Sequence, residues 1–118
     1  MDSKKSISDF PELDLKYLRE VSGGNEEFVQ QIIEIFIEDT PSMLNNIRES
    51  YAKGDFEKVK FYTHKLTSQL PMVGLNGAVD EARLIEKECN SLPDLENRIN
   101  GLIDFIEKGI EKLKQIKF

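Results

Sequence analysis

The sequence predicts an all-α protein, an up-down-up-down antiparallel four-helix bundle with a short additional N-terminal helix. Apolar residues recur at alternating steps of three and four along most of the chain, which is the period of helices that each bury one face. Short turn-forming stretches separate these segments, so consecutive long helices must run antiparallel. No run alternates between apolar and polar residues as a strand would.

Length and composition indicate one soluble globular domain. The 118 residues are 39% hydrophobic and 32% charged, which is enough for a continuous core and too little for two. We therefore expect residues 1–118 to form a single domain, in which residues 1–12 are a loose leader that crosses the bundle end and Phe10 tucks in. No apolar run approaches the roughly 20 residues that cross a bilayer, so we expect no direct membrane contact.

Charge and cysteine content narrow the partners and the compartment. The net charge of −6 argues against nucleic acid, because phosphate backbones are bound by basic surfaces. Cys89 is the only cysteine and cannot form an internal disulfide, which favours a reducing, cytoplasmic setting. We expect it to be a half-buried apolar filler, and we expect the protein to be a monomer.

The first helix is short. Asp14 is placed to cap a helix from Leu15 to about Val21, and the stretch Ser22-Gly23-Gly24 ends it. Its expected inward residues are Leu15, Leu18 and Tyr17.

A long segment follows from the cap residue Asn25 to Lys53. Pro41 interrupts it, which allows either one kinked helix or two helices that meet there, and we favour one kinked helix. The apolar face is expected to consist of Phe28, Ile32, Ile35, Phe36, Met43, Leu44, Ile47 and Tyr51.

The next helix is predicted from Asp55 to about Val73. Gly54 forces a tight hairpin before it, Pro71 lies in its last turn, and Gly74 is the natural left-handed stop. Its buried stripe is expected to be Phe56, Val59, Thr63, Leu66, Leu70 and Val73.

Two further helices complete the bundle. Asn76 is expected to cap a helix from Gly77 to about Cys89. Pro93 suits the first turn of a final helix that ends in lysines, which match the negative end of the helix dipole. The inner residues are expected to be Ala78, Val79, Ala82, Leu84 and Ile85 in the first, and Leu95, Ile99, Leu102, Ile103, Ile106, Ile110, Leu113 and Ile116 in the second.

The single histidine lies on the outer face of the helix from Asp55 to Val73. At about 100° per residue, His64 falls roughly 140° from the centre of the buried stripe and should face water. Its neighbours on this face include Lys60, Phe61, Thr67, Ser68 and Pro71.

Several catalytic classes are excluded by what the chain lacks. One histidine and one cysteine cannot build a zinc site by themselves, and a di-metal carboxylate bundle needs two Glu-x-x-His pairs. No glycine-rich phosphate-binding run is present, so a self-contained kinase is not expected. We therefore expect no metal or other cofactor in this chain.

His64 remains as a nucleophile. A neutral imidazole nitrogen can attack phosphorus, and the phosphoramidate that results can pass the phosphoryl group on. Thr67 and Ser68 are small and can donate hydrogen bonds, while Lys60 and Lys65 can bring positive charge near the phosphoryl oxygens. An exposed Phe61 would give a docking partner an apolar contact. A merely solvated histidine is the alternative.

The stretch His64-Lys65-Leu66-Thr67-Ser68-Gln69-Leu70-Pro71-Met72-Val73-Gly74 resembles the site of the histidine-containing phosphotransfer (HPt) domain family. That signature has an apolar residue two after the histidine, then a small run, and a glycine ten residues after the histidine. Upstream, Ser22-Gly23-Gly24-Asn25, Ile35-Phe36 with Pro41 and Lys53-Gly54-Asp55 also look like the family pattern. The resemblance spans nearly the whole chain.

The resemblance implies a phosphocarrier in a multistep two-component phosphorelay, with His64 as the phosphoacceptor and Gly74 as the stop of the site helix. The implied partners are response-regulator receiver domains and a hybrid sensor histidine kinase. Mg²⁺ and most of the catalysis would then come from the receiver, and the chain would not be an enzyme with its own ATP site.

Two residues depart from the family pattern. Thr67 stands where the family usually has lysine, and Ser68 where it usually has glycine. We expect transfer to survive with an altered partner preference or rate. The alternative is a degenerate helical adaptor that binds receiver or kinase domains without being phosphorylated.

Overall fold

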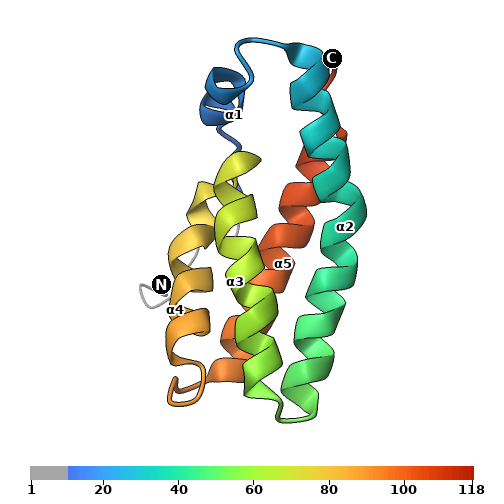
Figure 1. Cartoon of the computed structure of the whole chain (residues 1–118). Coiled ribbons are helices and arrows are strands. Elements are labelled where there is room, and N and C mark those ends of the chain that lie inside the picture. Colours follow the sequence, from blue (N-terminus) through green and yellow to red (C-terminus); the bar gives the residue numbers. More distant parts are fainter. Residues whose placement is uncertain (1–10) are drawn as a thin grey trace, which may run out of the picture.

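The computed structural model describes residues 11–118, in which four helices of 10 to 27 residues form an antiparallel bundle with a six-residue helix at one end (Figure 1). The elements are α1 (Lys16–Val21), α2 (Glu26–Ala52), α3 (Phe56–Met72), the 3₁₀ turn η1 (Asn76–Ala78), α4 (Val79–Glu88) and α5 (Leu95–Lys114). Residues 11–118 contain no strand, and the predicted fold class is confirmed. Phe10 and most of the expected leader lie outside the described residues.

The predicted caps begin two of the long helices. The Asn25 side chain accepts a hydrogen bond from the Phe28 amide at 3.1 Å, and Asp55 accepts one from the Lys58 amide at 3.2 Å. Each cap satisfies a backbone donor that the first helical turn leaves without a partner.

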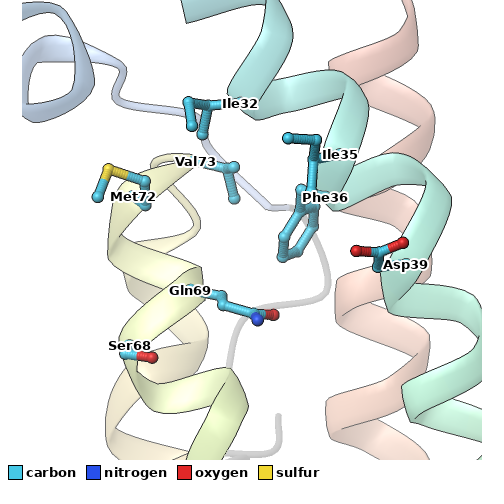
Figure 2. A pocket seen from close by; sticks show the side chains of 8 residues that line it. All are labelled: Ile32, Ile35, Phe36, Asp39, Ser68, Gln69, Met72 and Val73. Atoms are coloured by element: carbon cyan, nitrogen blue, oxygen red, sulfur yellow. The ribbon is translucent and has the colours of Figure 1, made fainter. Parts of the chain in front are cut away.

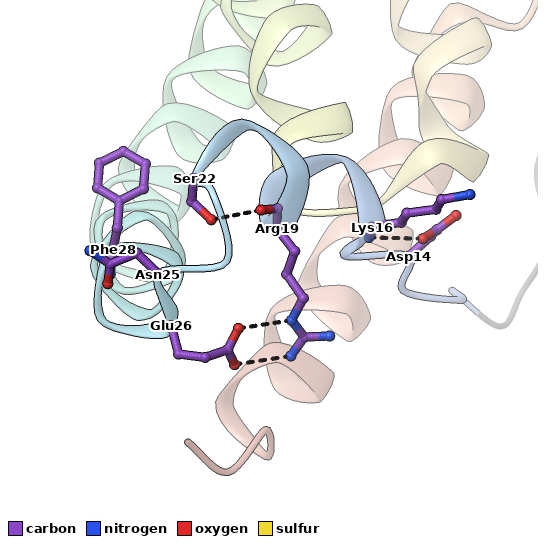
Figure 3. Close-up of polar contacts among 7 residues, drawn as sticks. All are labelled: Asp14, Lys16, Arg19, Ser22, Asn25, Glu26 and Phe28. Carbon is purple, nitrogen blue, oxygen red and sulfur yellow. Dashed lines mark hydrogen bonds and ion pairs between the residues drawn. The ribbon is translucent and has the colours of Figure 1, made fainter.

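Polar contacts hold both ends of α1 (Figure 3). Before the helix, Asp14 accepts a hydrogen bond from the Lys16 amide at 3.0 Å; across the turn to α2, the Arg19 guanidinium pairs with the Glu26 carboxylate at 3.0 Å. Tyr17 is 52% exposed, so its predicted inward position is wrong. Leu18 is the one buried residue of α1, because six residues make too few turns for a wide apolar face.

Helix α2 continues through Pro41 as one helix of 27 residues. The predicted register of its first half is wrong at Phe28 and Ile35, which are 42% and 55% exposed, while Val29 and Ile33 are buried. Phe28 and Ile35 lie seven residues apart and Val29 and Ile33 four, so both pairs fit the helical period. Periodicity alone cannot decide which of two adjacent apolar stripes meets the partner helices.

The core joins all five helices around α5, which supplies more of its buried members than any other helix. The largest fully buried side chains are Leu18, Ile33, Leu44, Ile47, Leu66, Leu70, Leu75, Ile85, Leu102, Ile103, Ile106 and Leu113. Leu84 is only half-buried, contrary to expectation.

Helix α3 ends as predicted. Gly74 has φ +79°, a left-handed conformation that glycine adopts without steric cost. Its carbonyl accepts a hydrogen bond from the Asp14 amide at 3.1 Å, so the end of α3 is joined to the segment before α1.

The starts of the last two helices differ from the sequence-based prediction. Asn76 opens a 3₁₀ turn rather than capping an α-helix, and α4 begins at Val79 without a side-chain cap. Pro93 lies two residues before α5, where Asp94 takes a left-handed φ of +60° as the N-cap. These ends are set by tertiary packing of the connections, which local patterns do not report.

Helix α4 is fixed by contacts on both sides. Arg98 of α5 donates two hydrogen bonds to the Glu81 carboxylate, at 3.1 and 3.2 Å, and the Glu81 side chain is almost fully buried. Cys89 is 2% exposed, which is deeper than the half-buried position expected, and burial raises the pKa of its thiol.

No helix within residues 11–118 is long and apolar enough to cross a membrane.

Candidate functional site

His64 lies in the middle of α3 with its side chain 70% exposed. The buried residues Val59, Thr63, Leu66 and Leu70 face the core and turn the imidazole outward. The prediction that His64 faces water is therefore confirmed. Because the inner face of α3 is packed against the bundle, the backbone that carries this imidazole has a fixed position.

One imidazole nitrogen of His64 is engaged by a residue from another helix. Nδ1 lies 2.8 Å from Oε2 of Glu86 on α4, and the Glu86 side chain is 31% exposed. This leaves Nε2 as the nitrogen without that contact. Glu86 was not predicted, because it lies 22 positions from His64 in sequence. The signal available was the expected antiparallel pairing of these two helices, which fixes a direction but no register.

The two residues that depart from the family pattern direct their hydroxyls to their own helix. Thr67 Oγ1 donates to the His64 carbonyl at 2.6 Å, and Ser68 Oγ donates to the Lys65 carbonyl at 3.1 Å. Thr67 is half-buried and Ser68 is exposed. Such bonds to the preceding turn are a common alternative for hydroxyl side chains in helices. The hydroxyls must rotate before they can reach any group bound at His64.

The two candidate lysines also have other neighbours. Lys65 places its ammonium 4.7 Å from the centre of the Phe61 ring, a cation–π geometry. Lys60 is half-buried, and its charge acts on the Cys89 thiol, where it opposes part of the pKa rise. Within residues 11–118, no hydrogen bond joins either ammonium to His64.

The expected docking residues lie on either side of His64. Phe61, one turn earlier, is 54% exposed and packs edge-on against Tyr62, with ring centres 5.2 Å apart. Pro71, two turns later, is half-buried and remains inside α3. Phe61 therefore offers a large apolar contact to a partner, whereas Pro71 offers less surface.

A groove of about 350 Å³ runs between α2 and α3 and reaches the His64 face (Figure 2). Gln69 and Phe36 both project into the space between the two helices. Ser68, one turn beyond His64, forms part of the wall, and Asp39 is the one charged residue in the lining. The remaining wall is apolar and consists of Ile32, Ile35, Met72 and Val73. Ile35, which was expected to be buried in the core but is exposed, is thus part of this groove.

Within residues 11–118, no three histidine, cysteine or carboxylate side chains gather as a metal site would require. The chemistry that the arrangement allows is nucleophilic attack by an imidazole nitrogen on a group brought by another molecule.

Comparison with known proteins gives one result. Residues 31–116 match the family model described as the Hpt domain. The match covers more than two thirds of the chain and includes all of α3, α4 and α5. No curated protein and no solved structure gave a significant match.

Proposed function

Because the chain belongs to the Hpt domain family, whose members carry phosphoryl groups in phosphorelays, we propose that it accepts and donates a phosphoryl group on His64. Hpt domains interact with receiver domains and kinases and are phosphocarriers rather than enzymes with a catalytic site of their own. The observation that carries this assignment is the exposed imidazole on the helix that the family match covers.

The proposed transfer step needs no metal ion bound to this chain. A lone pair on the imidazole attacks the phosphorus of a receiver aspartyl phosphate, and the P–O bond to the aspartate breaks with its electrons leaving on the carboxylate. The receiver would supply Mg²⁺ to neutralise the phosphoryl oxygens. His64 contributes a nucleophile at fixed position, and the reverse step returns the group to a second receiver.

The receiver would dock on the surface that surrounds His64. Phe61 is more than half exposed on one side of the imidazole, and the groove between α2 and α3 begins at Ser68 on the other. An apolar side chain of the receiver fits this groove, because all but three of its lining residues are apolar. We further propose a multistep relay in the cytoplasm that includes a hybrid sensor kinase, with this chain acting as a monomer.

Incubation with a phosphorylated receiver tests the assignment. We expect phosphate on the protein that is acid-labile and alkali-stable, as phosphohistidine is, and no label on His64→Gln. Glutamine suits an exposed helical position, so circular dichroism should show an unchanged fold. Absence of label on the unaltered protein, or label that persists in His64→Gln, would contradict the proposal.

The second candidate function is that of an adaptor that binds receivers without accepting phosphate. Thr67 and Ser68 favour it, because they replace a usual lysine and glycine and their hydroxyls are bonded to α3 itself. This function predicts receiver binding that is indifferent to His64→Ala and a protein that never carries phosphate. The labelling experiment therefore separates the two.

A further inference from the structure

The groove between α2 and α3 has an apolar end and a polar end (Figure 2). The apolar end consists of Ile32, Met72 and Val73. The polar end consists of Asp39, Gln69 and Ser68. Ser68 lies one turn after His64 on α3, whereas Val73 lies more than two turns after it. The polar end is therefore the end nearer to the histidine.

The polar end presents hydrogen-bond acceptors and a negative charge. The Asp39 carboxylate can only accept, and no hydrogen bond or ion pair joins it to another residue of 11–118. The Ser68 hydroxyl gives its proton to the Lys65 carbonyl at 3.1 Å, so its oxygen can only accept from a ligand. Gln69 projects into the groove and can turn its amide oxygen toward a donor. A cation with several N–H donors matches this end, whereas Asp39 repels an anion.

We propose that the groove binds a lysine or arginine side chain of the docking receiver, with its aliphatic stem between the apolar walls and its cationic group at Asp39. This inference rests on the proposed function, because it names the side chain that the receiver would insert beside His64. Ile35 and Asp39 are one turn apart on α2, about 6 Å, which suits the four-carbon stem of a lysine. Such side chains bury a hydrocarbon stem while the charged end stays near water. A purely apolar side chain would fill the same walls and leave Asp39 without a counter-ion.

The exposure of the polar end limits the size of the effect. Asp39 is exposed and Gln69 is half-buried, and ion pairs in such positions are weak and screened by salt. We expect loss of the Asp39 charge to weaken binding about two- to fivefold. Asp39 would act on the choice of partner and not on the reacting group, so the transfer rate at saturating receiver should not change.

Binding of two blocked amino acids tests the groove without any phosphotransfer. N-acetyl-lysine methylamide and N-acetyl-norleucine methylamide share a four-carbon stem, and only the first carries an ammonium. The methyl NMR signals of Ile35 and Met72 report occupancy, because both residues line the groove. We expect the lysine probe to reach half-saturation at a concentration about two- to fivefold lower than the norleucine probe. Asp39→Asn should remove this difference.

Glu38→Gln is the matched control for the titration. Glu38 is the exposed neighbour of Asp39 on α2 and does not line the groove, so this variant should keep the preference for the lysine probe. The proposal is overturned by equal binding of the two probes, by unchanged methyl signals with both, or by a lysine preference that survives Asp39→Asn. Self-association that Asp39→Asn abolishes would also overturn it, because the groove would then hold a second copy of this chain.

Transfer kinetics give a second readout. With a receiver that phosphorylates the protein, Asp39→Asn should raise the receiver concentration at half-maximal rate about two- to fivefold, and added salt should reduce this difference. The rate at saturation should be unchanged, and Glu38→Gln should alter neither value. An Asp39→Asn variant with unaltered kinetics would contradict the proposal while the phosphocarrier function stands. If no receiver phosphorylates the protein, the proposed function fails, and the probe titration still decides which side chain the groove binds.

Discussion

On the outer face of α3, the imidazole of His64 and the hydroxyls of Thr67 and Ser68 differ in how their polar atoms are hydrogen-bonded. His64 has one nitrogen engaged by α4 and one open to solvent, whereas the hydroxyls of Thr67 and Ser68 are bonded to backbone carbonyls of their own helix. A group bonded to its own backbone gains nothing further unless it rotates, and rotation breaks a bond worth about 1 kcal/mol. The surface near His64 therefore offers a nucleophile but no ready hydrogen-bond donor from these two residues.

Thr67 offers a prediction at this scale. Thr67→Ala removes a hydroxyl that is bonded to the His64 carbonyl, so we expect the transfer rate to change less than about twofold. Thr67→Lys places an ammonium one turn from His64, where it can bind phosphoryl oxygens, and should raise the rate several-fold. Initial rates with a phosphorylated receiver measure both. A Thr67→Ala variant as inactive as His64→Gln would show instead that the hydroxyl takes part in transfer.

The helices differ in how much of their packing the sequence reveals. For α3, one apolar stripe exists and the predicted members are largely buried. For the first half of α2, two adjacent stripes exist, because Ile32 and Ile35 line the groove while Val29 and Ile33 enter the core. A helix that packs on a core and also lines a groove is apolar over a wider arc of its surface. The neighbouring helices then determine which of its apolar residues are buried.

The end of α3 provides a prediction for an element boundary. Gly74→Ala combines a left-handed φ of +79° with a Cβ that would lie 2.6 Å from the Asp14 amide nitrogen. We expect it to lower the free energy of unfolding by about 2–4 kcal/mol, from backbone strain and steric overlap together. Urea denaturation followed by circular dichroism measures this loss.

Gly23→Ala is the matched control for that substitution. Gly23 also has a left-handed φ, +64°, but a Cβ there would meet nothing within 4 Å. The loss should be about 1 kcal/mol, from backbone strain alone. Equal losses for the two variants would show that the contact with Asp14 adds nothing to the cost of ending α3.

At the scale of the whole molecule, the sequence predicts the bundle better than it predicts the site. Helical periods and turn residues are local, so the long helices, the caps Asn25 and Asp55 and the stop at Gly74 could all be predicted. Glu86 could not, because its meeting with His64 depends on how far α4 slides along α3. The connection between α3 and α4 contains a 3₁₀ turn and is irregular, so it carries no periodic signal.

The ion pair between Glu81 and Arg98 ties α4 to α5 and yields a prediction for the whole bundle. Helix α4 has only 10 residues and no side-chain cap, so it depends on tertiary contacts for its position. Glu81→Gln keeps the shape of the side chain but removes the charge that accepts two hydrogen bonds from a largely buried guanidinium. We expect the free energy of unfolding to fall by about 2 kcal/mol, because two hydrogen bonds to a buried carboxylate become weaker bonds to a neutral amide oxygen.

Glu111→Gln separates this effect from the loss of any surface charge. Glu111 pairs with Lys114 at 3.2 Å, but both side chains are more than half exposed, so the loss should be below about 0.5 kcal/mol. Urea midpoints measured by circular dichroism and by tyrosine fluorescence should coincide if the bundle unfolds as one unit. Equal midpoints for Glu81→Gln and Glu111→Gln would contradict a stabilising role for the buried pair. A Glu81→Gln variant whose two probes give different midpoints would show that the bundle no longer unfolds as one unit.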